Sequence, residues 1–373
     1  MKIGIDARLY GTKYRGLGRY IKKLVDGVTR LNDNNQYVIF LTRENYDEFK
    51  TDNKRIKKVL MNARWYSLKE QIIVSWIIKR EKVDLMHFPH FNVPLNYNKK
   101  YIVTIHDLII DHFPTSRATN LPKWQYNLKL KGYQKIIRHA IAKADKIIVP
   151  TKFGKIDLIS MYQVPENKIK VIYEGYFLDT THEESDIKRF NIAKPYLLYV
   201  GAAYPHKNLE MLVKAFENVN KEDKYQLVLV GNIDKFYERV KKKINSSDIL
   251  FTGYVSESEL KGLYQKALIY IFPSLYEGFG LPPLEAQAHG LPVISSNESC
   301  LPEVLEDSVI YFDPRNEIDI IKKINLILND QNLRGELVIK GRENIKRFSW
   351  EKMISETEEI YEYVLGTDIL HLF

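Results

Sequence analysis

The sequence predicts an α/β protein of two doubly wound domains, each a parallel sheet covered by helices on both faces. Short apolar runs rich in Val, Ile and Tyr alternate with longer amphipathic stretches, as in strand–helix repeats. These runs fall into two series, separated by a polar segment without a strand pattern. The length of 373 residues suits about two ordinary domains, and the hydrophobic content of 45% is enough for two cores.

The first series of apolar runs predicts six strands in the amino-terminal half. They are Lys2–Ile5, Tyr37–Leu41, Leu85–Phe88, Ile102–Ile105, Lys146–Val149 and Lys170–Ile172. A helical pattern at Leu17–Arg30 follows the first strand. Parallel strands are buried on both faces, which explains why these runs are continuous rather than alternating.

The second series predicts six more strands. They are Tyr196–Val200, Gln226–Val230, Ile249–Phe251, Ile269–Phe272, Pro292–Ser295 and Ile310–Phe312. A helical pattern at Leu209–Val219 connects the first two. Strand and helix alternate here as they do in the first half, so we expect a second sheet of the same kind.

The domain boundary is predicted at residues 178–195, a polar stretch that ends in Pro195. We expect residues 1–178 to form the first domain and residues 179–349 the second. A final helical pattern, Trp350–Leu365, follows Ser349, which is a suitable N-cap residue. We assign this helix, at about residues 350–373, to the first domain. Packing on the second domain is the alternative.

The net charge of +9 is unevenly distributed along the chain. Residues 1–180 contain 33 Lys and Arg against 17 Asp and Glu, whereas the remaining residues contain 23 against 30. The net charge is therefore +16 in the first part and −7 in the second. A basic half is typical of proteins that bind an anionic membrane surface, a phosphorylated substrate or nucleic acid. A solvated basic surface has the same composition.

The single cysteine, Cys300, excludes an intrachain disulfide and suits a reducing compartment. It has no neighbouring base in the sequence, so we interpret it as inert packing. The amino terminus lacks the apolar run of a signal peptide, and no stretch reaches 18 uninterrupted apolar residues. We therefore expect a cytoplasmic protein, or one that is peripheral at the inner face of the cell membrane.

The segment from Ile269 to Ser295 carries the strongest functional signal. It predicts a strand, a loop with two glycines, a helix that starts near Pro282 and ends before Gly290, and another strand. Backbone amides and the dipole at such a helix start favour a phosphate. Glu277 and Glu285 would accept hydrogen bonds from hydroxyl groups, which a nucleotide sugar carries on both sides of its diphosphate. A glycine–proline turn with two surface glutamates is the alternative.

This segment resembles the family-4 retaining glycosyltransferases, whose GT-B fold has two Rossmann-like domains facing across a cleft. Residues 277–285, EGFGLPPLE, are similar to the E-x7-E motif of that family, and FPSLYE, GLPV and LPE around it match as well. The resemblance covers nearly the whole chain. It implies that Glu285 binds the ribose and that Glu277 contacts the transferred sugar. It also implies that backbone amides reach the sugar or phosphate around Gly278, Phe279, Gly280 and Leu281.

A second donor contact is predicted in residues 196–209, YLLYVGAAYPHKNL, which read as strand, loop and helix start. Lys207 can neutralise a diphosphate as a point charge, and the resemblance implies this role. A solvated lysine at a helix start is the alternative. Many members of the family have an arginine after the glycine, where this chain has Ala202, or beside the lysine, where it has His206. His206 would supply a hydrogen-bond donor that is at best half charged near neutral pH.

The first domain supplies further candidates. Gly16 and Gly18 lie after the first strand and open a helix, but they lack the third glycine of a dinucleotide fingerprint. The resemblance implies that they approach the donor phosphate and the acceptor. Arg15 or Arg19 would meet an anionic acceptor, unless both are solvated surface charges. His106 follows a strand whose carboxyl end faces the ligand crevice, and the resemblance implies a contact with the donor sugar; a core histidine is the alternative.

Two weaker patterns complete the site prediction. Val255 follows the strand at Ile249–Phe251, and the resemblance implies that it contacts the base. His87 and His90 have two residues between them, but no cysteine or third histidine follows at metal-ligand spacing, so we predict no metal site. The chain contains no Asp-x-Asp, which agrees with metal-independent catalysis. We expect no cofactor besides the GDP- or UDP-linked sugar donor.

We therefore expect a retaining hexosyltransferase that uses GDP-mannose or a UDP-sugar. The acceptor would be a hydroxyl of a glycan or lipid-linked molecule, in cell-surface polysaccharide, lipopolysaccharide or glycolipid synthesis. The wording PHKN at 205–208 is closest to mannosyltransferases. We expect same-face attack, with Glu277 away from the nucleophile role that glycosidase chemistry would suggest.

Alternatives from other classes remain. A sugar-nucleotide epimerase has the same fold, and a non-catalytic nucleotide-sugar-binding protein would explain Ala202. Nucleic-acid binding rests on charge alone and lacks a recognition pattern. Trp124 and the lysines from Lys123 to Lys135 predict a helix face that contacts an anionic membrane, or a helix that simply covers a sheet.

Overall fold

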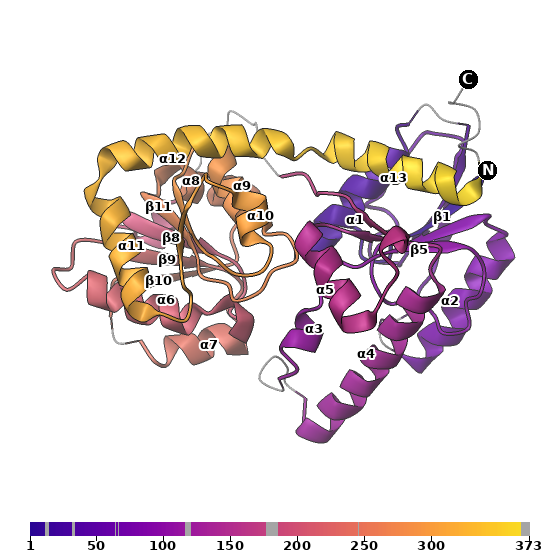
Figure 1. Cartoon of the computed structure of the whole chain (residues 1–373), viewed down its shortest axis with the longest axis horizontal. Helices are drawn as coiled ribbons and strands as arrows, with labels where there is room; N and C mark the ends of the chain where they lie inside the picture. Colours follow the sequence, from indigo (N-terminus) through magenta and orange to yellow (C-terminus); the bar gives the residue numbers. More distant parts are fainter. Residues whose placement is uncertain are drawn as a thin grey trace. The chain divides into compact units, whose positions relative to one another are not determined.

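The structure, a computed structural model, describes residues 1–11, 15–31, 34–63, 65, 67–115, 121–176, 186–244 and 246–366 (Figure 1). The chain divides into two compact units. Unit 1 comprises Met1–Leu108, Leu121–Gly175 and Ser349–Phe373, and unit 2 comprises Ile109–Asn120 and Tyr176–Phe348. Each unit contains one parallel sheet, as the sequence predicts. The described part of the chain has no helix long and apolar enough to span a bilayer.

Unit 1 contains a seven-stranded sheet with the order β3-β2-β1-β4-β5-β6-β7. Its strands are β1 (Lys2–Asp6), β2 (Gln36–Leu41), β3 (Ile56–Leu60), β4 (Leu85–Phe88), β5 (Tyr101–Thr104), β6 (Lys146–Val149) and β7 (Ile169–Val171). The unit's longer helices are α1 (Arg15–Val28), α2 (Leu68–Glu81), α4 (Lys123–Lys143), α5 (Lys152–Tyr162) and α13 (Trp350–Leu365). A buried cluster joins one face of the sheet to α2, α4 and α5. The helices α1 and α13 pack against each other, and α13 also contacts β4 (Figure 1).

The six strands predicted for this half are present within one residue at each end, but the sequence analysis missed β3. Its sequence, IKKVL, has two lysines in the middle, and it is the edge strand of the sheet. One side of an edge strand is open to solvent, so polar residues interrupt the apolar run that marks a buried strand.

Unit 2 contains a six-stranded sheet with the order β10-β9-β8-β11-β12-β13. Its strands are β8 (Tyr196–Val200), β9 (Gln226–Val230), β10 (Ile249–Gly253), β11 (Ile269–Phe272), β12 (Val293–Ser296) and β13 (Ile310–Phe312). All six were predicted. Its helices are α3 (Ile109–His112), α6 (Leu209–Val219), α7 (Lys235–Lys241), α8 (Glu257–Lys266), α9 (Leu281–Ala288), α10 (Leu301–Leu305), α11 (Glu317–Asn329) and α12 (Gln331–Asn344). The predicted helix Leu209–Val219 is confirmed in full.

The last helix, α13, packs on α1 within unit 1. Gly27 of α1 permits this close approach, because a Cβ atom there would lie 1.9 Å from Cδ1 of Ile354. Tyr361 of α13 reaches the sheet and its hydroxyl lies 2.7 Å from Nδ1 of His87 in β4. Residues 367–373 of the predicted terminal segment, and residues 178–185 of the predicted boundary, lie outside the described part of the chain.

Each sheet has one point where the strand order reverses, between β1 and β4 in unit 1 and between β8 and β11 in unit 2. The connections that leave the carboxyl ends of these two strands run to opposite sides of the sheet. They leave a crevice at that edge, which is where open α/β sheets bind ligands. The fold therefore singles out the loops after β8 and β11 in unit 2, and those after β1 and β4 in unit 1.

Candidate active site

The predicted donor residues of unit 2 meet at the reversal point of its sheet. The loop after β8 ends in a short 3-10 turn, Pro205–Lys207, and the loop after β11 runs from residue 273 to Gly280. The two loops are joined by a hydrogen bond from the amide of Leu275 to the carbonyl of His206, at 2.7 Å. Residues some 70 positions apart in the sequence are thus brought together by the pairing of β8 with β11.

Lys207 and Glu277 form an ion pair at the centre of this site. Nζ of Lys207 lies 2.6 Å from Oε1 of Glu277, and the two side chains are 18% and 9% exposed. The backbone amide of Glu277 donates to Oγ of Ser299 at 3.0 Å, which holds the backbone at Glu277 from the loop after β12. A largely buried pair of this kind interacts strongly, because little water is present to screen it. Lys207, predicted to contact the diphosphate, and Glu277, predicted to contact the transferred sugar, are therefore direct partners.

The glycine-rich loop leads directly into α9. Gly280 is the N-cap residue and has φ +95°, a conformation that a residue with a side chain rarely adopts. A Cβ atom at this position would also lie 2.9 Å from Cδ2 of Leu301. Phe279 packs edge-on against Phe348, with ring centroids 5.4 Å apart. The turn at Gly278–Leu281 thus depends on glycine and on a fixed aromatic anchor.

The lone cysteine supports the backbone of this loop. Cys300 is fully buried and its Sγ lies 3.3 Å from the carbonyl oxygens of both Glu277 and Phe279. Burial, with the nearby charges of Glu277 and Glu303, raises the pKa of the thiol well above its usual value. A thiol held in this way is not a nucleophile, which agrees with the packing interpretation of Cys300.

Glu285 is the fifth residue of α9, and its side chain is buried on the helix. The hydroxyl of Tyr264, from α8, donates to Oε2 of Glu285 at 3.2 Å. The ring of Tyr264 stacks on that of His289, whose Nδ1 lies 2.8 Å from the carbonyl of Glu285. The carboxylate therefore has a fixed orientation and still has acceptor capacity for hydroxyl groups of a ligand.

His206 does not provide the second positive charge considered at this site. It is buried, and burial together with the charge of Lys207 lowers its pKa to about 4, although Glu277 acts in the opposite direction. The ring of His206 is therefore neutral at neutral pH. It lies beside the rings of Tyr204 and Phe113, with centroids 5.8 and 5.9 Å away. Ala202, in the same loop, is buried and accepts a hydrogen bond from the hydroxyl of Tyr199.

Val255, the predicted base contact, lies two residues beyond β10 and is half-buried. Gly253 before it has φ +71°, and the register with β9 shifts between Phe251 and Gly253. Ser256 after it caps α8 in a reciprocal capping box with Glu259. The backbone at Val255 is therefore held between two well-defined turns, but β10 is the edge strand and lies two strands from β8.

The remaining predicted residues, Gly16, Gly18 and His106, belong to unit 1. Both glycines lie in the first turn of α1, and Gly18 is buried. Residues 12–14 and the side chain of Arg15 lie outside the described part of the chain, and Arg19 is half-buried. His106 follows β5, where Nδ1 lies 3.1 Å from Oε1 of Glu174 and Nε2 lies 3.1 Å from the carbonyl of Pro89.

Both ring nitrogens of His87 have partners within unit 1. Nδ1 of His87 lies within hydrogen-bond distance of the Tyr361 hydroxyl, and Nε2 lies 2.9 Å from Oγ1 of Thr104. Burial and the charge of His106 lower the pKa of His87 to about 3. Among the residues that the structure describes, no group of three His, Cys, Asp or Glu is arranged to hold a metal ion.

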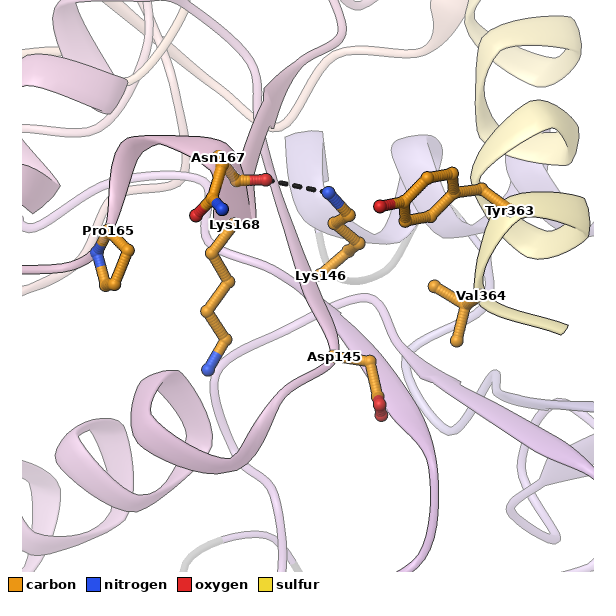
Figure 2. A pocket seen from close by; sticks show the side chains of 7 residues that line it. All are labelled: Asp145, Lys146, Pro165, Asn167, Lys168, Tyr363 and Val364. Atoms are coloured by element: carbon orange, nitrogen blue, oxygen red, sulfur yellow. Dashed lines mark hydrogen bonds between the residues drawn. The ribbon is translucent and has the colours of Figure 1, made fainter. Parts of the chain in front are cut away.

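A cavity of about 430 Å³ lies elsewhere in unit 1 (Figure 2). It opens at the amino ends of β6 and β7, the edge of the sheet opposite to the predicted ligand edge. Its lysines already have partners: Nζ of Lys146 donates to the carbonyl of Asn167 at 2.7 Å and lies 4.4 Å from the ring centroid of Tyr363 (Figure 2). Lys168 donates to the carbonyl of Ala142. None of the predicted site residues lines this cavity.

Sequence reasoning missed several supporting residues of the site. They are Tyr264 and Ser299 in unit 2, and Glu174 in unit 1. Each of them contacts a site residue that is at least 21 positions away in the sequence. The spacing of residues within a motif therefore could not predict these contacts. Glu174 carried one signal, since it follows a predicted strand at its carboxyl end.

Two doubly wound units, with a glycine-rich helix start beside a lysine–glutamate pair, define a glycosyltransferase of the GT-B class. Comparison with known families agrees. The family model described as "Glycosyltransferase Family 4" matches residues 14–180, and "Glycosyl transferases group 1" matches residues 181–344. The chain belongs to the glycosyltransferase family that these two models describe.

Individual relatives have low sequence identity to this chain. The chain is 26% identical to O-antigen chain mannosyltransferase B of Escherichia coli over 374 aligned positions, which cover 93% of this chain and 96% of that protein. It is 29% identical to O-antigen chain mannosyltransferase RfbU of Salmonella typhimurium, over 68% and 67% of the two chains. Among solved structures, WaaG, a glycosyltransferase involved in lipopolysaccharide biosynthesis, is similar in fold with a TM-score of 0.74. Its sequence identity is 15%, and the match covers 96% and 99% of the two chains.

Proposed function

We propose that this glycosyltransferase is a retaining hexosyltransferase that moves a hexose from a nucleotide sugar to a hydroxyl of a glycan or lipid-linked acceptor. The observation that carries the proposal is the buried Lys207–Glu277 pair at the reversal point of the second sheet, next to the start of α9. A cation suits the diphosphate, and a carboxylate suits the sugar hydroxyls. Both stand where an α/β sheet binds its ligand.

The proposed reaction is same-face substitution at the anomeric carbon. The bond from this carbon to the diphosphate oxygen breaks, the acceptor oxygen bonds on the same face, and the acceptor proton passes to the departing diphosphate oxygen. Lys207 and the backbone amides at the start of α9 stabilise the charge on the leaving group. Donor binding shares or breaks the 2.6 Å contact between Lys207 and Glu277, which frees the carboxylate for the sugar.

Glu285 is proposed to bind the ribose, because Tyr264 fixes one of its oxygens and the carboxylate can accept further hydroxyl donors. Val255 is proposed to contact the base through its backbone. No step in this scheme uses a metal ion. Activity that is unchanged by EDTA, with and without added Mg²⁺, is the expected result for metal-independent transfer, and loss of activity that Mg²⁺ restores would contradict it.

GDP-mannose is the donor we propose first, since both relatives described above are named as mannosyltransferases. The test is a thermal-shift panel of GDP-mannose, UDP-glucose, UDP-galactose and UDP-N-acetylglucosamine, followed by product analysis with the donor that binds. Replacement of Glu285 by Gln should abolish the shift, and replacement of Lys207 by Met should leave a smaller one. If no sugar nucleotide shifts the melting temperature, the donor-site assignment is wrong.

Product analysis with the donor that binds also distinguishes the two alternative functions. An epimerase would convert the sugar of the donor without an acceptor, and a non-catalytic binding protein would bind the donor without transfer or hydrolysis. Retention is tested separately by NMR of the product, because an α-linked donor must give an α-linked product. A β-linked product would refute same-face substitution.

We also propose that unit 1 contacts an anionic membrane surface. Trp124 and Leu128 of α4 are 67% and 65% exposed, and at spacing i, i+4 they lie on one face with the exposed Lys131 and Lys135. The carboxyl-terminal half of α4 buries Tyr133, Ile137, Ala140 and Ile141, so the helix both covers the sheet and exposes an amphipathic end.

Helix α2 has a second face of the same kind. Ile72 and Trp76 are 68% and 61% exposed, and Lys69 and Arg80 complete the stripe at helical spacing. The two acidic residues of α2, Glu70 and Glu81, are both buried. The exposed charge of this helix is therefore entirely basic, which suits anionic lipid and disfavours a second copy of the same face.

Co-sedimentation with vesicles of neutral lipid, with and without anionic lipid, tests the membrane proposal. Binding should require anionic lipid, weaken with salt, and fall in the variants Trp124→Ser/Leu128→Ser and Ile72→Ser/Trp76→Ser. Tyr254→Ser is the matched control, because Tyr254 is an equally exposed aromatic residue of unit 2. Absence of binding to anionic vesicles at low salt would refute the proposal.

A further inference from the structure

Each ring nitrogen of His106 faces a hydrogen-bond acceptor. Nε2 lies 3.1 Å from the carbonyl oxygen of Pro89, and Nδ1 lies 3.1 Å from a carboxylate oxygen of Glu174. A carbonyl oxygen can only accept, and an ionised carboxylate can only accept. Both ring nitrogens must therefore carry a hydrogen, so this geometry requires an imidazolium rather than a neutral ring.

The charge on His106 has an identifiable origin. Burial disfavours it, but the hydrogen bond and charge of Glu174, the charge of Asp107 and the carbonyl of Pro89 outweigh burial and raise the pKa of His106. Glu174 is itself buried, so water screens the pair weakly. The contact links the loop after β7 to the loops after β4 and β5, at the carboxyl edge of the first sheet.

The other titratable groups around His106 do not compete for this charge. His87 and His90 both have a pKa lowered to about 3, by burial first and then by the charge of His106, with Arg8 acting on His90 as well. Tyr20 of α1 meets the His106 ring edge-on at a centroid distance of 4.5 Å, and burial raises the pKa of its hydroxyl. At neutral pH these three neighbours are uncharged, and His106 is the charged member of the cluster.

We propose that Glu174 is a positioning residue that keeps His106 as a fixed cation, and that this cation serves a phosphate group of the substrates. The proposal rests on the proposed function. It places a positive charge on His106 at the carboxyl edge of the first sheet, whereas the ring of His206 in unit 2 is neutral. The phosphate belongs either to the donor diphosphate or to a phosphorylated acceptor.

The first test measures protonation without any substrate. The ring nitrogen signals of His106 are identified by NMR as those lost in His106→Asn, and are followed from pH 5 to pH 9. In the unmodified protein both nitrogens should remain protonated above pH 6.5, the usual midpoint of histidine. In Glu174→Gln the midpoint should fall below 6.5, and Glu174→Asp should restore part of the shift.

The matched control for this test is Glu166→Gln. It is the same substitution on the 3-10 turn that precedes β7, at an exposed glutamate that pairs with Lys155. It should leave the His106 midpoint unchanged. The proposal is wrong if His106 of the unmodified protein is neutral at pH 7, or if Glu174→Gln leaves its midpoint in place. This result stands whether or not the protein transfers sugar, so it is independent of the proposed function.

The second test uses substrates. Glu174→Gln should weaken nucleoside diphosphate binding about tenfold at neutral pH, and the loss should shrink only as the pH falls to the His106 midpoint measured for that variant. If the acceptor phosphate is the partner instead, the same loss should appear in the KM for the acceptor while diphosphate binding is unchanged. A pH-independent loss equal in both variants of Glu174 would indicate a purely structural role and would overturn the proposal.

Discussion

Breaking the Lys207–Glu277 pair from either side should reveal a large coupling between the two residues. Lys207→Met leaves the carboxylate of Glu277 buried without its cation, which costs about 3–5 kcal/mol when a buried pair is broken. Glu277→Gln should cost less, because the amide remains a hydrogen-bond acceptor for Lys207. In the double variant no charge is left unpaired, so its loss of stability should be smaller than the sum of the single losses. We expect a coupling of about 1.5–3 kcal/mol, the range for a hydrogen bond between charged groups.

The assay is urea unfolding with two probes. The four tryptophans, at positions 65, 76, 124 and 350, all lie in unit 1, so their fluorescence follows that unit, whereas far-UV circular dichroism reports on both units. The single variants should lower the urea midpoint measured by circular dichroism and leave the midpoint measured by tryptophan fluorescence unchanged. Losses that add to within about 0.5 kcal/mol would refute the direct pairing of Lys207 with Glu277.

Two further predictions concern the frame of unit 1. Gly27→Ala should lower the free energy of unfolding of unit 1, measured by tryptophan fluorescence, by about 1–3 kcal/mol, since the added Cβ would lie 1.9 Å from Cδ1 of Ile354. Gly132→Ala, in α4, is the control and should be neutral or stabilising, because no atom lies within 4 Å of that Cβ; equal stability of the two variants would contradict close packing of α1 on α13. His87 has a folded pKa of about 3, below its unfolded value near 6.5, so the unfolded chain binds the proton more tightly and stability is lost as pH falls through 6.5. Between pH 7 and pH 5 this contributes a loss of about 2 kcal/mol, which His87→Gln should remove; an unchanged pH dependence of the urea midpoint would refute it.

The donor segment was readable from sequence because its chemistry is local. Glycine at 280, proline in the first turn of α9 and glutamate at 285 are set by the turn and the helix themselves, and the structure has all three in the expected places. Strand prediction succeeded for the same reason, since a continuous apolar run has few alternatives in an α/β chain. It failed at β3, where an edge position relaxed the demand for apolar residues.

The protonation states of the two histidines could not be predicted from the sequence. His206 and His106 each lie in a loop that follows a predicted strand, yet their pKa values move in opposite directions. His206 is buried beside Lys207, while His106 is held by Glu174, which lies 68 positions away. Spacing within a motif does not show which distant carboxylate or cation the fold will bring to a ring.

The sequence by itself determined the class of fold, the order of strands and helices, and the loop that carries Gly278 to Leu281. Those features depend on periodicity and on backbone preferences of single residues, which act over a few positions. The tertiary structure decided which side chains contact one another. Lys207 pairs with Glu277, and Tyr264 donates a hydrogen bond to Glu285. The carboxylate of Glu174 lies within hydrogen-bond distance of His106. Strand order brings these residues together, and the free energy of a buried charge depends on the partners that burial supplies.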